Sequence, residues 1–232
     1  MPSHRELASL SRRDLFRMAA SAGVTLGGGA AAGLIGARPA QAQTTITPDD
    51  ALKALMDGNA RFRTNKLTSF QEDLTILAQK TAEKQEPFAA VLSCADSRVP
   101  VEILFDQTIG HVFVVRIAGN VATPEIVASL EYGAAVLGTR LLMVLGHSAC
   151  GAVTAAIAGK AVPGQISALY APLRPAVDQA GPDPDATIRA NARIQASLLG
   201  KASPVFADMV AGGKLKIVAG HYDIGSGEVT LV

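Results

Sequence analysis

The sequence lacks several features that would place it in common protein classes. It has no tryptophan and only two cysteines in 232 residues, too few for a disulfide-rich scaffold, so the cysteines form one disulfide, two buried thiols or metal ligands. Lys and Arg number 21 against 20 Asp and Glu, and this lack of a basic excess argues against nucleic acid as a partner. The hydrophobic content of 49% argues against disorder, and the length predicts one domain with a substantial core.

The first 42 residues have the pattern of an export signal rather than of a folded segment. The pattern consists of a twin-arginine pair, an apolar run rich in Gly and Ala, and an A-x-A cleavage site, found at 12–13, 18–35 and 40–42. The run is short and ends at a cleavage pattern, so we expect no stable membrane anchor. We predict removal of residues 1–42 and a single mature domain over 43–232. Its expected location is the periplasm or the cell exterior, reached already folded by the twin-arginine route.

The mature chain alternates apolar, strand-like runs with helix-like segments, which is typical of a mainly parallel sheet flanked by helices. Strands are predicted over 88–93, 111–117, 140–146 and 214–219, with an edge strand over 228–232. Helices are predicted over 48–63, 70–84, 124–137, 149–159, 186–199 and 204–210, while boundaries within 162–184 are not defined by the pattern. The predicted fold class is therefore α/β.

Two polar motifs follow two of the predicted strands. Cys94-x-Asp96-x-Arg98 follows the first strand, and His147-x-x-Cys150 follows the third. Ligand sites in open α/β sheets lie beyond the carboxyl ends of the strands, so both motifs fall where a site is expected. Two thiolates and one imidazole suit tetrahedral zinc and leave a fourth position open, as in catalytic zinc sites.

Simpler explanations of the same residues stay open at this stage. Cys94 and Cys150 can form a disulfide in an oxidising compartment, although that leaves His147 without a role. Asp96 and Arg98 can form an ordinary ion pair, but at alternate positions of an extended segment their side chains project to one side. The other two histidines of the mature chain, at positions 111 and 221, are interpreted as surface or strand-end residues rather than ligands.

Together the two motifs resemble the zinc signature of the beta class of carbonic anhydrases. The similarity covers nearly all of the mature chain and includes the segments 105–107, 113–116, 118–120, 131–133 and 146–151. The resemblance implies reversible hydration of carbon dioxide to bicarbonate and a proton, through attack of zinc-bound hydroxide on CO2. It also implies a homodimer, alone or paired into a dimer of dimers, with active sites at the subunit interface.

The resemblance assigns a role to each residue of the two motifs. Cys94, His147 and Cys150 correspond to three permanent ligands of one Zn²⁺ per chain. Asp96, when it is paired with Arg98, accepts a hydrogen bond from zinc-bound water. In a closed state Asp96 leaves Arg98 and takes the fourth zinc position.

The resemblance also implies a substrate pocket. Gln85 corresponds to a glutamine that hydrogen-bonds the substrate. Phe113 and Tyr132 correspond to residues that line the apolar carbon dioxide pocket, to which the partner subunit contributes. Gly151 leaves room beside Cys150.

One position departs from some bacterial members of the class. Those members carry a tryptophan three residues before the first cysteine ligand, in a noncatalytic bicarbonate site that favours the closed state. Val91 stands there in this chain, so no bicarbonate-gated closure of that kind is expected. Two alternatives stay open: hydrolysis of carbonyl sulfide or carbon disulfide at the same site, and a noncatalytic module that binds zinc or bicarbonate. A passive zinc site would need a fourth protein ligand, which argues against the module.

Overall fold

The computed structural model describes residues 44–69, 78–79, 81–82 and 84–232. The predicted signal, residues 1–42, lies outside the described residues, as does most of the helix predicted over 70–84. No helix in the described part of the chain is long and apolar enough to cross a membrane.

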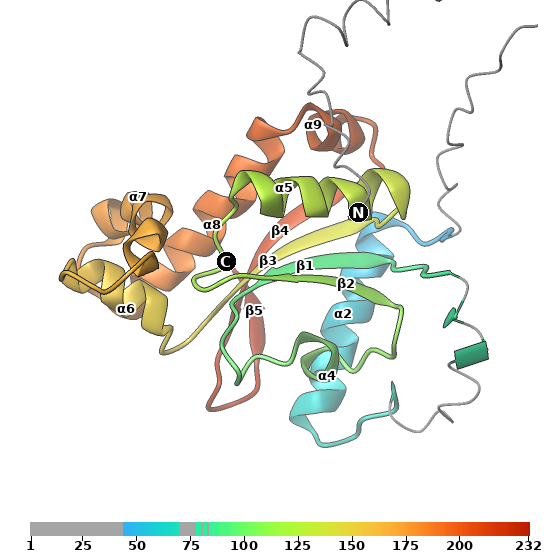
Figure 1. The fold of residues 1–232 in the computed structure, drawn as a ribbon. Helices are drawn as coiled ribbons and strands as arrows, with labels where there is room; N and C mark the ends of the chain where they lie inside the picture. The colour runs from blue at the N-terminus through green and yellow to red at the C-terminus, as the bar shows by residue number, and fades with distance from the viewer. Residues whose placement is uncertain (1–43, 70–77, 80, 83) are drawn as a thin grey trace, which may run out of the picture. The chain divides into compact units, whose positions relative to one another are not determined.

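The observed elements follow the predicted alternation of strands and helices (Figure 1). The strands are β1 (Ala89–Ser93), β2 (Val112–Arg116), β3 (Leu141–His147), β4 (Lys216–Tyr222) and β5 (Val229–Leu231). The α-helices are α2 (Pro48–Arg63), α4 (Val101–Leu104), α5 (Pro124–Glu131), α6 (Gly151–Ala158), α7 (Tyr170–Ala180), α8 (Pro184–Ala202) and α9 (Pro204–Ala211). A π-helical turn, η2 (Tyr132–Val136), continues α5, and a 3₁₀ turn, η3 (Ile166–Leu169), precedes α7.

The five strands form one sheet in the order β2-β1-β3-β4-β5. The first four strands are parallel to one another, and β5 pairs antiparallel with β4 at one edge. The predicted fold class, a mainly parallel sheet flanked by helices, is confirmed. All residues of β1 and β3 are buried, whereas β2 at the opposite edge is only partly covered.

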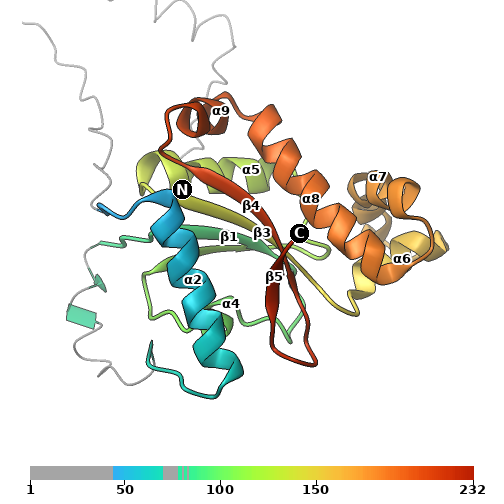
Figure 2. The same ribbon diagram turned by 180° about the vertical axis from the view of Figure 1, so that it is seen from behind.

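The helices cover both faces of the sheet, because alternate strand residues point to opposite sides. Ala89 and Val91 pack with α2 and α4, whereas Ala90 and Leu92 pack with α5, α8 and α9. Figures 1 and 2 show α5 and α2 on opposite sides of the sheet. The central strands β1 and β3 are therefore buried on both faces.

A third buried cluster lies beyond the carboxyl ends of the strands, where α6 and α7 pack together (Figure 1). It contains Cys94 and Cys150 together with Val121, Leu173 and Ile188. Both cysteines are therefore buried among the residues of α6, α7 and α8 at the end of the sheet. This is the region where the sequence predicts a site.

Three local features differ from the sequence prediction. The undefined region over 162–184 contains α7, whose interior Pro175 interrupts the usual helix signal. The helix predicted over 124–137 changes to η2 at Tyr132. Strand β4 runs to Tyr222, so His221 lies near the strand end, as expected, and is buried.

Candidate metal centre

Three potential metal ligands from two separate segments of the sequence meet at the carboxyl edge of the sheet. Cys94 follows β1, His147 is the last residue of β3, and Cys150 is the N-cap of α6. Their ligand atoms all lie within 4.8 Å of one another. All three residues are buried, and both cysteines are free thiols, so the structure does not contain the alternative disulfide.

The histidine is oriented for metal binding. Nδ1 of His147 lies 3.0 Å from the carbonyl oxygen of Ser148, a contact that suits a protonated Nδ1. Nε2 is buried and has no hydrogen-bond partner, which is costly for a polar atom unless something else satisfies it. Two thiols and this nitrogen match the donor set of zinc, whose ligand distances of about 2.0–2.3 Å fit a cluster of this size. The donor set therefore fits a zinc ion.

The backbone between His147 and Cys150 makes a tight turn that brings both ligands to one place. Ala149 adopts a positive φ of 55°, a conformation that is uncommon for a residue with a Cβ. The N–H of Ser148 donates to Tyr222 on β4, and its hydroxyl accepts from Ile224. These bonds fix the strained turn against the neighbouring strand.

The two thiols affect each other's protonation. A hydrogen bond with Cys150 lowers the pKa of Cys94, with smaller contributions from His147 and from the backbone N–H of Gly119. The same hydrogen bond, together with burial, raises the pKa of Cys150. One thiolate therefore forms readily at neutral pH, which favours metal binding because thiolate is the ligand form.

Asp96 and Arg98 form a fixed ion pair above this cluster. Arg98 donates from Nε to Oδ1 at 2.9 Å and from Nη2 to Oδ2 at 2.7 Å, and its backbone N–H also donates to Oδ1 at 2.9 Å. These hydrogen bonds are the main reason that the pKa of Asp96 lies well below its usual range. Oδ2 of Asp96 is 3.9 Å from Nε2 of His147, so an ionised carboxylate faces the metal position.

Arginine side chains also join the segments that carry the ligands. Nη2 of Arg98 donates to the carbonyl of Ala149, between the two ligands of the second motif. Arg116, at the end of β2, donates from Nε to the carbonyl of Cys94 at 2.9 Å and from Nη2 to the carbonyl of Asp96. This role of Arg116 is not predictable from the sequence, because nothing in the sequence shows which backbone carbonyls the side chain reaches.

The predicted substrate residues are not brought to the cluster within one chain. Gln85 is exposed and precedes the amino end of β1, whereas the cluster lies beyond its carboxyl end. Phe113 pairs in register with Ala90, which lies four residues before Cys94, or about 13 Å along an extended strand. The ring of Tyr132 lies beside that of Phe113, with 6.3 Å between centroids.

The last predicted site residue, Gly151, is the first residue of α6. A Cβ added at this glycine would meet no atom within 4 Å. There is therefore open space beside Gly151, next to Cys150.

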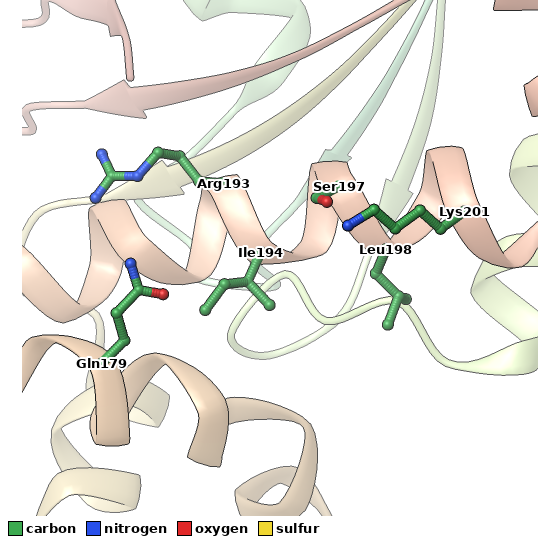
Figure 3. Close-up of a pocket in the computed structure, with 6 residues that line it drawn as sticks. All are labelled: Gln179, Arg193, Ile194, Ser197, Leu198 and Lys201. Atoms are coloured by element: carbon green, nitrogen blue, oxygen red, sulfur yellow. The ribbon is translucent and has the colours of Figure 1, made fainter.

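A groove on the outer surface of the helices is separate from this centre. It has a volume of about 490 Å³ and lies along α8, with α7 beside it (Figure 3). Its lining residues are Gln179, Arg193, Ile194, Ser197, Leu198 and Lys201. None of the predicted site residues lines it.

Comparisons with known proteins agree with this geometry. A sequence model of the carbonic anhydrase family matches residues 89–229. Carbonic anhydrase 2 of Mycobacterium tuberculosis is 35% identical over 192 residues, covering 79% of this chain and 92% of that protein. A carbonic anhydrase of Pseudomonas aeruginosa is 30% identical over 194 residues, covering 77% and 86%. The solved beta-carbonic anhydrase of Coccomyxa, in complex with acetazolamide, has a TM-score of 0.62 at 26% identity, covering 78% and 86%.

Proposed function

Because the chain belongs to the beta class of the carbonic anhydrase family, we propose that it catalyses the reversible hydration of carbon dioxide to bicarbonate and a proton. The observation that carries this proposal is the pairing of a three-ligand cluster with an ionised carboxylate. Cys94, His147 and Cys150 converge, and Arg98 holds Asp96 over them. Three ligands with an open fourth position are typical of catalytic zinc sites.

The three ligands would hold zinc, and zinc supplies the Lewis acidity that lets water act as a nucleophile near neutral pH. The protein supplies orientation. Asp96 accepts a hydrogen bond from the attacking water and so aims its lone pair at the carbon of CO2. Arg98 donates three hydrogen bonds to the carboxylate, which keep Asp96 ionised and fix its orientation.

The position of the substrate residues supports a homodimer. Tyr132 is 47% exposed, and Phe113 lies on the partly covered edge strand β2. Neither side chain reaches the metal-ligand cluster of its own chain. Gln85 precedes the amino end of β1, whereas the cluster lies at the carboxyl end of that strand. We propose that a second copy of the chain brings Gln85, Phe113 and Tyr132 to this site, where the rings provide an apolar pocket for CO2 and the amide binds bicarbonate.

The proposed location rests on the sequence of the first 42 residues. The twin-arginine pair and the Ala40-x-Ala42 pattern support export in folded form. We propose that residues 43–232 form the mature single-domain enzyme, in the periplasm or outside the cell. In that oxidising compartment, metal ligation protects both thiols from oxidation.

Stopped-flow measurement of CO2 hydration tests this function. The assay uses the mature chain from Gln43, with zinc per chain quantified in the same sample. Rapid hydration with one zinc per chain is expected. Full zinc occupancy with hydrolysis of carbonyl sulfide or carbon disulfide but no hydration of CO2 would contradict the proposed substrate. Little zinc and no free thiols would contradict the metal centre itself.

A further inference from the structure

The Cys94 thiol receives a hydrogen bond from a loop that is distant in sequence. The backbone N–H of Gly119 donates to Sγ of Cys94 at 3.3 Å. A hydrogen bond to a metal-bound thiolate withdraws charge from sulfur and so tunes the metal. Cys150 differs, because it is the N-cap of α6 and its sulfur makes no capping hydrogen bond with that helix. The donor to Cys94 therefore depends on whatever holds the Gly119 loop in place.

Two buried amides of α8 hold that loop. Nδ2 of Asn191 donates to the carbonyl of Gly119 at 2.9 Å, and Oε1 of Gln195 accepts from the N–H of Ala122 at 2.9 Å. Asn191 and Gln195 are 1% and 3% exposed, so these bonds lie in the interior. Buried amides are costly unless they are satisfied, and their positions are therefore well defined.

The two amides also bond to each other and to a third helix. Nε2 of Gln195 donates to Oδ1 of Asn191 and to the carbonyl of Pro172 on α7, each at 3.1 Å. The pair thus joins α7, α8 and the Gly119 loop in one network. Such a network specifies position more strictly than apolar packing does, because each bond has a direction.

Packing fixes the glycine from the other side. Gly119 has a positive φ of 77°, and a Cβ there would lie 3.2 Å from Cδ1 of Leu173 and 3.4 Å from Cβ of Ala152. The loop therefore has α6 and α7 on one side and the two amides of α8 on the other. Its N–H cannot turn away from Cys94 without breaking these contacts.

We propose that Asn191 and Gln195 are positioning residues for the metal centre, which aim the N–H of Gly119 at Cys94 and thereby limit the charge that this thiolate donates to the metal. The proposal rests on the proposed function in assigning zinc to the cluster. Two thiolates donate more charge to a metal than imidazoles do, which weakens its ability to acidify water. A hydrogen bond to one of the two sulfurs partly offsets that donation.

The test compares Asn191→Leu and Gln195→Met with Thr187→Val. Thr187 is also buried on α8, and its hydroxyl donates to the carbonyl of Gly181, away from the Gly119 loop. The control therefore removes a buried hydrogen bond from the same helix without touching the network. We expect zinc affinity, measured by competition with a chromophoric chelator, to fall about 10- to 100-fold in the two network variants, and to stay within about twofold in the control.

Cobalt(II) substitution provides a readout that loss of stability alone would not move. Loss of the N–H···S bond raises the energy of the sulfur lone pair, so the sulfur-to-cobalt charge-transfer band should move to longer wavelength in Asn191→Leu and Gln195→Met. It should not move in Thr187→Val. Equal bands in all four proteins, or equal weakening of zinc binding in the control, would overturn the proposal.

A measurement on the unmutated protein covers the case in which a variant fails to fold. In protein loaded with an NMR-active cadmium isotope, the amide proton of Gly119 should show scalar coupling to cadmium through the sulfur of Cys94. Absence of that coupling would overturn the proposal. None of these readouts needs CO2 turnover, so a failure of the proposed function is recognised separately, as normal metal binding without hydration.

Discussion

Replacing Asp96 with asparagine tests the catalytic role of the carboxylate while sparing the metal ligands. In the structure Oδ1 accepts from the backbone N–H and Nε of Arg98, and Oδ2 accepts from Nη2 and faces His147. The asparagine carbonyl can replace Oδ1 and keep two of these bonds. Its amide nitrogen then stands in place of Oδ2, where it presents a donor to Arg98 and to the metal position instead of an acceptor.

This exchange sets the size of the expected effect. The acceptor for the attacking water is lost, whereas Cys94, His147 and Cys150 and their contacts are unchanged. A positioned proton acceptor contributes about 10²- to 10⁴-fold to a rate, which corresponds to about 2.7–5.4 kcal/mol at about 1.36 kcal/mol per factor of ten. We expect kcat for CO2 hydration to fall by that factor in Asp96→Asn, with zinc per chain unchanged.

The assay is stopped-flow CO2 hydration with metal analysis of the same sample. Asp57→Asn is the matched control, because it removes one carboxylate from an exposed ion pair with Lys53 on α2 and should leave both quantities unchanged. Turnover at the wild-type level in Asp96→Asn, with full zinc, would refute the role of Asp96. Loss of zinc in that variant would refute the argument that the carboxylate acts without serving as a ligand.

Three further predictions concern the ligands and the framework. Cys150→Ser should lose zinc and activity together, as judged by metal analysis and CO2 hydration, because thiolate ligation supplies much of the binding energy; retention of zinc would contradict the ligand assignment. Burial opposes ionisation of Asp106, but hydrogen bonds from Ser69, Arg61 and Thr68 hold its pKa below the usual range. The ionised carboxylate therefore stabilises the folded protein above about pH 3.9, and this contribution is lost as the pH falls below that value. Acid titration of the free energy of unfolding should therefore show about 1.5–3 kcal/mol less stability for Asp106→Asn than for wild type near neutral pH, with the gap closing in acid; a gap independent of pH would count against this. Gly119→Ala should destabilise the fold by about 1–2 kcal/mol because of its positive φ, measured by urea unfolding, and an unchanged midpoint would show that the loop is not held as described.

The sequence predicts the metal ligands because their placement follows from a general rule. Cys94 directly follows one strand and His147 ends another, and parallel strands bring their carboxyl ends to one edge. This placement does not depend on the exact register between β1 and β3. The short spacing from His147 to Cys150 then required only a turn, which the structure provides at Ala149.

The hydrogen-bond network that positions the metal centre could not be predicted from the sequence in the same way. Asn191 and Gln195 are four residues apart on α8, a spacing that also occurs on solvent-facing helix surfaces. Only their position among the buried residues Ile188, Ala192 and Leu199 marks them as interior polar groups. Helix α7 was missed for a different reason, since proline within a helix removes the local signal, and tertiary packing stabilises it instead.

The metal ligands come from two segments that are distant in sequence and meet only because β1 and β3 pair in the finished sheet, which has a consequence for biogenesis. While the chain is being synthesised, Cys94 emerges well before its partner strand exists, and the network on α8 emerges later still. A partly made chain therefore has no complete metal site to fill. The metal therefore binds late, and a chain that holds its metal has already assembled its sheet and covering helices.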